Sequence, residues 1–211
     1  MKNDLKSIED IKTIRKIMEE SSRFLSLSGI SGVLAGVIAI AGALVTYLAI
    51  LDNGNIPFAD YLNTLSEQKS VLQKWQLIGV AATVLLLSLL FAFYLSIKKA
   101  KRDNKTVWTP VSKRLLINMF IPLAAGGIFI IMLMIQSYFL LIIPCFLIFY
   151  GLALVNAGKF TFGEIFYLGI LEIIIGLFAA FIPAQGLLFW IIGFGILHII
   201  YGLVMYRKYG A

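Results

Sequence analysis

Two stretches near the C-terminus decide the fold: GEIFYLGILEIIIGLFAAFI at residues 163–182 and LLFWIIGFGILHIIYGLVMY at residues 187–206. Each is about 20 residues long and almost wholly apolar, which is the length that an α-helix needs to cross a bilayer. A short segment with Pro183 and Gly186 separates them, and such residues are typical of a turn. The pair therefore predicts two antiparallel transmembrane helices.

Four further apolar runs extend this pattern toward the N-terminus. The predicted spans are residues 25–51, 77–97, 115–135, 138–156, 163–182 and 187–206. The chain has 211 residues, of which 60% are apolar and only 14% are charged. A soluble domain of this size cannot bury so much apolar surface. The sequence predicts an all-α, polytopic membrane protein whose six transmembrane helices form three helical hairpins.

The lysines and arginines are divided unequally between the two sides of this arrangement. If six spans alternate, only Lys69 and Lys74 fall on one side, and the other cations of the chain fall on the opposite side. Cytoplasmic loops carry an excess of Lys and Arg. Both termini are therefore predicted to lie in the cytoplasm.

The chain divides into two predicted domains, a cytoplasmic amphipathic helix at residues 1–24 and a six-helix transmembrane domain at residues 25–211. In the first, Ile8, Ile11 and Ile14 recur at helical spacing among charged residues. Such a helix lies on the inner leaflet, packs on the bundle, or binds a cytosolic protein partner. These alternatives stay open, as does assembly into a homo-oligomer.

The loops predict contacts with the lipid bilayer. The basic loop KKAKRDNKTVWTPVSKR, residues 98–114, suits anionic lipid headgroups at the cytoplasmic face. Nucleic acid is not expected as a partner, because positive charge between two spans already has a topological role. Trp75, Tyr206 and Tyr209 lie at span ends and are predicted to be interface anchors.

Glycines follow one helix face in three of the spans. Their three- and four-residue spacing lets helices approach closely. The predicted helix-packing glycines are Gly29, Gly32, Gly36, Gly169, Gly176, Gly195 and Gly202. Short motifs also recur at about 50 residues, since Tyr150-Gly-Leu is answered by Tyr201-Gly-Leu, which predicts a parallel repeat of a two-helix hairpin.

Glu172 and His198 are the candidate functional residues of the apolar interior. They are equally distant from the turn between the last two spans, so they should lie at one depth, near the midplane. An acid and an imidazole at matched depth suggest an intramembrane polar pair. A structural pair and a proton- or ion-linked site are both open, because ionisable groups at this depth are costly and commonly functional.

The last two spans also resemble a known family. The segment LGILEIIIGLFAAFIPAQGLLFWIIGFGILHIIYGLVMYRKYG is similar to the repeating unit of the HdeD-like acid-resistance membrane proteins, with matches at Gly176, Pro183, Gly193 and Gly202. The first span, with the preceding SSRFLSLSGISGVLAG, resembles a set of six-span inner-membrane proteins from Bacteroidota. These resemblances imply a multi-pass protein of the bacterial inner (plasma) membrane and bring no catalytic site.

We expect a non-enzymatic integral inner-membrane protein with a structural, stress-response or regulatory role. One alternative is a small proton-linked transporter or channel subunit that uses Glu172 and His198, and it requires water to reach Glu172. Another is a membrane sensor that couples to a cytosolic partner through the N-terminal helix. No catalytic residues, cofactors or metal are expected, because His198 and Cys145 are the single histidine and cysteine of the chain.

Overall fold

The computed structural model describes residues 27–65, 71–104 and 106–209, and every regular element in these ranges is helical. Six helices in this part of the chain are long and apolar enough to cross a membrane. They are Gly29–Ile50, Lys74–Arg102, Pro110–Ile135, Phe139–Gly158, Gly163–Phe181 and Pro183–Tyr209. The prediction of an all-helical protein with six apolar helices is confirmed, and the chain is a membrane protein. The predicted amphipathic helix at residues 1–24 lies outside the described residues.

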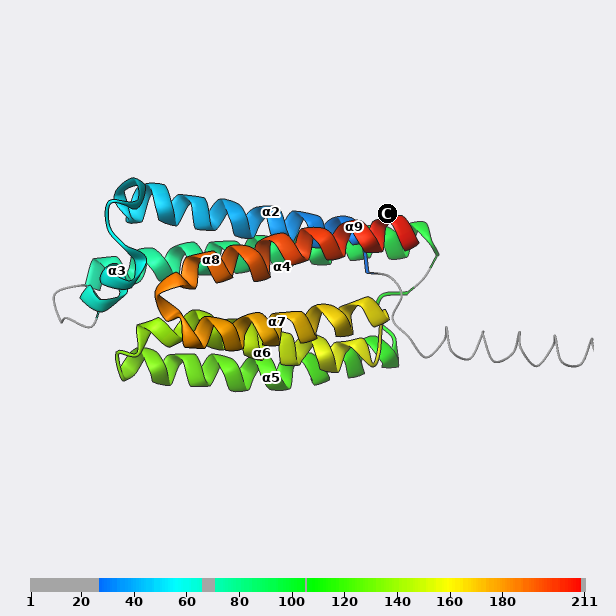
Figure 1. Ribbon diagram of the computed structural model, residues 1–211. Coiled ribbons are helices and arrows are strands. Elements are labelled where there is room, and N and C mark those ends of the chain that lie inside the picture. Colours follow the sequence, from blue (N-terminus) through cyan, green and yellow to red (C-terminus); the bar gives the residue numbers. More distant parts are fainter. Residues whose placement is uncertain (1–26, 66–70, 105, 210–211) are drawn as a thin grey trace, which may run out of the picture.

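The helices form two layers (Figure 1). In the first layer, α2 (Gly29–Val45) lies between α4 (Val71–Arg102) and α9 (His198–Tyr209). The π-helical turn η1 (Thr46–Ile50) continues α2, while α8 (Gly186–Trp190) and the π-helical segment η5 (Ile191–Leu197) lead into α9. The last span is thus one continuous rod with a π-helical middle.

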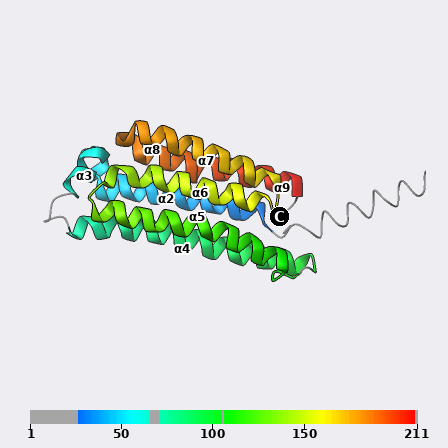
Figure 2. The same ribbon diagram turned by 90° about the horizontal axis from the view of Figure 1, so that it is seen from below.

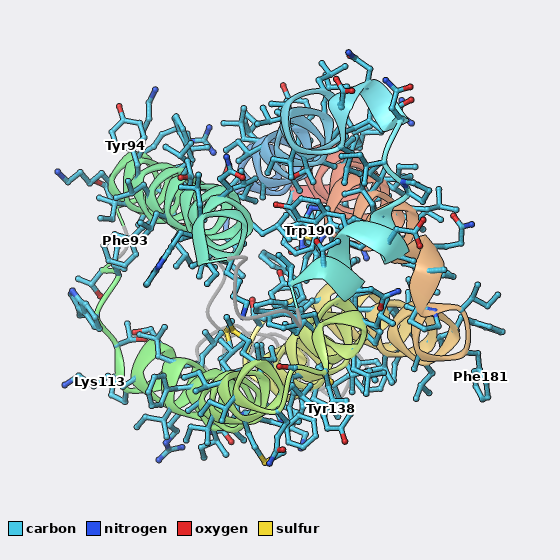
Figure 3. All side chains as sticks on the ribbon, turned by 90° about the vertical axis from the view of Figure 1, so that its left-hand side faces the viewer. Phe93, Tyr94, Lys113, Tyr138, Phe181 and Trp190 are labelled. Atoms are coloured by element: carbon cyan, nitrogen blue, oxygen red, sulfur yellow. The ribbon has the colours of Figure 1, made fainter. Side chains whose placement is uncertain are left out.

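The second layer contains α5 (Pro110–Ile135), α6 (Ile142–Gly158) and α7 (Gly163–Phe181), with α6 between the other two. Viewed from below, this layer lies in front of the first (Figure 2). The layers meet where α7 packs on α8, η5 and α9, and where α6 packs on α8. On the opposite edge, α4 and α5 lie apart although a short loop joins them (Figure 3).

The helices at the basic loop are longer than the apolar runs from which we predicted them. The helix α4 continues to Arg102, beyond the predicted end at residue 97, because lysine and arginine suit the negative end of a helix dipole. The helix α5 begins at Pro110, before the predicted start at residue 115. There Thr109 and Ser112 form a reciprocal capping box. Polar residues thus extend both helices past the apolar segment.

The opposite end of the bundle is covered by the segment between α2 and α4. It contains the 3₁₀ turn η2 (Asp52–Gly54) and the short helix α3 (Phe58–Thr64), and α3 packs on the turns η3 (Phe139–Leu141) and η4 (Pro183–Gln185). Buried apolar side chains hold the contact, namely Leu51, Tyr61, Leu62, Leu65 and Phe139. Burial there also raises the pKa of the Tyr61 hydroxyl. The turns of both layers are therefore joined at this end.

Candidate functional site

The glycines of the first span pack against the last span. A Cβ atom on Gly29 would lie 2.7 Å from the carbonyl oxygen of Gly202, and a Cβ atom on Gly202 would lie 2.7 Å from that of Gly29. Likewise a Cβ atom on Gly36 would lie 2.5 Å from the carbonyl oxygen of Gly195. Gly32 is close to Gly202 as well. These glycines bring the backbones of α2 and the η5–α9 rod into direct contact.

The glycines of α7 pack against α6, not against the last span. A Cβ atom on Gly169 would lie 2.7 Å from the carbonyl oxygen of Gly151, and the reverse distance is 2.6 Å. Gly176 lies against Ile148, where a Cβ atom would be 2.7 Å from the side chain. Gly151 was absent from the predicted packing glycines. Each layer therefore holds one glycine-packed helix pair, and the glycine faces of α7 and α9 have different partners.

Glu172 and His198 meet at the boundary between these two pairs. Glu172 lies halfway along α7, about 14 Å from either end of the helix at the usual rise per residue. Its side chain is 0% exposed, and its Oε1 atom lies 3.4 Å from Nδ1 of His198, which is 8% exposed. The structure thus places the two residues side by side, one from each layer.

The carboxylate of Glu172 has no hydrogen-bond partner at either oxygen. In the part of the chain that the structure describes, these are the only buried side-chain nitrogen or oxygen atoms in that condition. The 3.4 Å approach to His198 is longer than a normal N–H···O bond. Leaving a buried polar group unpaired costs about 1–3 kcal/mol, and a charged group costs more. Such a group calls for a chemical explanation.

The imidazole of His198 is fixed at both nitrogens. Its Nδ1 atom lies 3.1 Å from the carbonyl oxygen of Gly193, and its Nε2 atom lies 2.8 Å from the hydroxyl of Tyr150. A carbonyl oxygen only accepts, so Nδ1 carries a proton. A neutral ring then accepts from the Tyr150 hydroxyl, whereas a charged ring donates to it. Tyr150 can therefore partner His198 in either charge state.

Gly193 completes the site from the π-helical segment η5. A Cβ atom at this position would lie 2.7 Å from Oε2 of Glu172 and 2.5 Å from a methyl group of Leu147. Glycine therefore leaves the space that the carboxylate occupies. Short π-helical segments occur frequently at functional sites. Tyr150 and Gly193 were not among the predicted site residues, although the Tyr-Gly-Leu motif and the family resemblance each drew attention to one of them.

Aromatic rings surround the polar cluster. The ring of Phe194 lies 5.3 Å from that of Tyr150 and 4.7 Å from that of Trp190. Trp190 donates from Nε1 to the carbonyl oxygen of Ala39 at 3.2 Å. In Figure 3 Trp190 lies between the two layers, whereas Tyr94, Lys113, Tyr138 and Phe181 lie on the periphery. Phe194 thus contacts both the indole of Trp190 and the Tyr150 ring of the cluster.

A second polar contact joins the layers at the end that carries the basic loop. Glu164 of α7 accepts from Nζ of Lys208 at 2.5 Å and from the hydroxyl of Tyr209 at 3.2 and 3.3 Å. The ring of Tyr209 also stacks on Phe162, with centroids 4.2 Å apart. Nearby, Nζ of Lys99 in α4 donates to the carbonyl oxygens of Leu27 at 3.1 Å and of Tyr209 at 3.5 Å. These contacts tie the ends of α7, α9 and α4 together.

The predicted interface anchors differ in their surroundings. Trp75 at the start of α4 and Tyr206 in α9 are exposed on the surface of the helix bundle. Tyr209 also donates a hydrogen bond to Glu164 and so contributes to packing within the protein. The anchoring role of all three stays a prediction.

Comparison with protein-family models, with curated proteins and with solved structures finds no match to this chain. The chemistry of the site must come from its own residues. No group of three or more His, Cys, Asp or Glu side chains gathers at one place in the described residues. What the cluster offers is a carboxyl, an imidazole and a phenol in contact, and these are groups that bind and pass protons.

Proposed function

We propose that this chain is a non-enzymatic, multi-pass protein of the bacterial inner membrane with a regulatory role, and that it responds to pH through Glu172 and His198. One observation carries the proposal: the Glu172 carboxylate is fully buried, unpaired at both oxygens and 3.4 Å from an imidazole. Holding a full charge there without a hydrogen bond is expensive. Binding a proton removes that charge, so the Glu172 carboxylate is the expected proton acceptor of the site.

The position of the pair links its protonation to the arrangement of the helices. Glu172 and Tyr150 belong to the second layer and His198 to the first, and each layer is held internally by close glycine contacts. Among the described elements packed on α7, the titratable groups of the cluster are His198, which lies 3.4 Å from Glu172, and Tyr150, which is bonded to His198; Tyr201 is the next titratable residue along α9. A changed proton count therefore acts on the contact between layers.

Several features support the wider setting of the proposal. The end with the basic loop is proposed to face the cytoplasm, with both termini, because positive charge gathers there. Its exposed cations are proposed to contact anionic lipid headgroups. Packing of α2 on α4 and of α5 on α6 supports an arrangement in hairpins. The HdeD-like resemblance of the last two spans supports a role in acid stress.

Trp190 provides the test. We would replace Trp75 and Trp108, both exposed, with phenylalanine, so that Trp190 is the only tryptophan of the full chain. In nanodiscs, its emission should change between about pH 8 and about pH 5, a range wide enough to include the usual titration of an imidazole. Glu172→Gln in the same background should show no such change.

Glu164→Gln is the matched control, because Glu164 lies on the same helix but outside the cluster. It should keep the response of the parent. A response of Glu172→Gln that equals the parent's would overturn the proposal, since another group would then be the proton acceptor.

A small proton-linked transporter is the second candidate, favoured by the π-helical segment beside the site. Irregular helix near the midplane is a feature of transporter binding sites. This function requires a state in which water reaches Glu172, whose side chain is 0% exposed here. Proton flux into proteoliposomes, compared between the parent and Glu172→Gln, tests it. Equal flux excludes this candidate and leaves the regulatory one.

A further inference from the structure

The six apolar spans form a ring that is open at one place, between α4 and α5. Every other neighbouring pair packs together, since α4 lies on α2, α2 on α9, α9 on α7, α7 on α6 and α6 on α5. Figure 3 looks along the spans with the side chains drawn, and no described side chain crosses the space between α4 and α5. We call this space the α4–α5 slot.

The slot is bounded at both of its ends. At one end, the short basic loop joins α4 to α5. At the other end, Leu77 of α4 packs on the apolar cluster that contains Phe139, and Nζ of Lys74 lies 5.4 Å from the ring centroid of Phe139. From Leu77 to Lys98 an α-helix rises about 32 Å, which is close to the thickness of the hydrocarbon core of a bilayer. The slot therefore opens sideways, toward the acyl chains of the membrane.

The halves of α4 and α5 nearest the basic loop expose large hydrophobic side chains. Over residues 85–94 of α4 every exposed residue is Leu, Phe or Tyr, and over residues 116–123 of α5 every exposed residue is Leu, Ile or Phe. Helices pack in lipid through small residues, as the glycine contacts of the other spans show. These two surfaces lack such residues at their exposed positions, so they suit flexible acyl chains better than another helix.

Positive charge gathers where the slot meets the basic loop. The segment of residues 98–114 has seven cations and one acid, Asp103. Lys101 at the end of α4 and Lys113 at the start of α5 are both exposed, one on each helix that borders the slot. A ligand that is apolar along the helices and anionic at this end therefore matches the slot in both respects.

We infer that one anionic phospholipid occupies the α4–α5 slot, with its acyl chains against both helices and its phosphate at the cations of the basic loop. Such a lipid closes the open edge of the ring, because it contacts a helix of each layer. This is one defined site, beyond the general attraction of the exposed cations to lipid headgroups. It does not depend on the titration of Glu172.

The first test measures lipid binding by the full chain in detergent. Phosphatidylglycerol and phosphatidylcholine with identical acyl chains are added separately, and native mass spectrometry counts the bound molecules. The parent should bind one phosphatidylglycerol, with a Kd at least about tenfold lower than that for phosphatidylcholine. Lys101→Gln combined with Lys113→Gln should remove most of this preference.

Lys159→Gln combined with Arg207→Gln is the matched control. These exposed cations lie at the same end of the molecule, on the loop after α6 and on α9, so the double variant loses as much charge but none beside the slot. It should keep the preference of the parent for phosphatidylglycerol.

The second test locates the lipid in the unaltered chain. Phosphatidylglycerol with a diazirine in one acyl chain should form adducts within residues 85–94 and 116–123. Unlabelled phosphatidylglycerol should displace these adducts more than the same amount of phosphatidylcholine does. Adducts on the exposed face of α7 serve as the reference, because both lipids should displace them equally.

Equal affinity for the two lipids, or an equal loss of preference in both double variants, would overturn the proposed lipid site. So would adducts that phosphatidylglycerol displaces preferentially but that lie away from α4 and α5. A dimer in the native spectra whose α4 and α5 carry no adduct would overturn it as well, because a second copy would then fill the slot. The adduct assay uses the parent chain, so it decides the matter even if a variant fails to fold.

Discussion

At the scale of residues, Glu172 combines complete burial with two unpaired oxygens. An apolar side chain of similar size would fill the same space without the cost of desolvation. His198 shows the opposite condition, with a partner at each nitrogen. The pair is therefore fixed on the imidazole side and open on the carboxylate side.

The first prediction concerns the cost of that carboxylate. Glu172→Met keeps the length of the side chain and removes both unpaired oxygens, so it should stabilise the protein by about 1–3 kcal/mol. It should also abolish the pH response. Glu164→Met, on the same helix, removes an acceptor of Lys208 and Tyr209 and should be neutral or destabilising. Unfolding in mixed micelles measures both, and a lower stability of Glu172→Met would contradict the prediction.

A second prediction concerns Tyr150. Tyr150→Phe removes the hydroxyl that lies 2.8 Å from Nε2 of His198 and should lower the free energy of unfolding by about 1 kcal/mol. Tyr167→Phe is the control, since that side chain is 68% exposed on the outer surface of α7. Thermal midpoints in detergent compare the two variants. Equal midpoints would show that the bond to His198 contributes nothing measurable.

At the scale of elements, the helices pack through backbone contacts at glycine. The α2–α9 pair has reciprocal approaches of Gly29 and Gly202, and the α6–α7 pair has those of Gly151 and Gly169. In lipid, helices gain no hydrophobic energy by meeting, so close packing and polar contacts select the partners. The two glycine pairs therefore explain why α7 associates with α6 and why the last span associates with the first.

A third prediction compares two mid-helix glycines. Gly202→Ala would place its Cβ atom 2.7 Å from the carbonyl oxygen of Gly29, and the strain should destabilise the protein by about 1–3 kcal/mol. Gly127→Ala meets no atom within 4 Å, so the higher helix propensity of alanine should leave stability equal or slightly raised. Urea or detergent unfolding tests the difference. Similar losses in both would argue against a special role of the α2–α9 contact.

At the scale of the whole molecule, two three-helix layers meet along one edge and part along the other. Contacts at both ends and the cluster at the middle hold α7 to the last span, while α4 and α5 lie apart (Figure 3). The ends of the molecule also differ, since one carries the basic loop and the other is covered by α3. This polarity is the basis of the proposed orientation in the membrane.

A fourth prediction addresses that direction. In a Cys145→Ala background, which lacks cysteine, Asp60→Cys and Lys101→Cys each place one exposed thiol at opposite ends of the molecule. A membrane-impermeant maleimide should label Asp60→Cys on intact cells and Lys101→Cys only after the cells are opened. Labelling of Lys101→Cys from outside would contradict the proposed orientation.

The number of helices could be predicted from the sequence, because length and apolarity are local properties that a bilayer selects directly. The matched depth of Glu172 and His198 also followed from helix rise and one turn. The tertiary structure decided which helix each glycine face meets, and it added Tyr150 and Gly193 to the site. Partner choice in lipid depends on the shapes of two surfaces, and a periodic run of glycines describes only one of them.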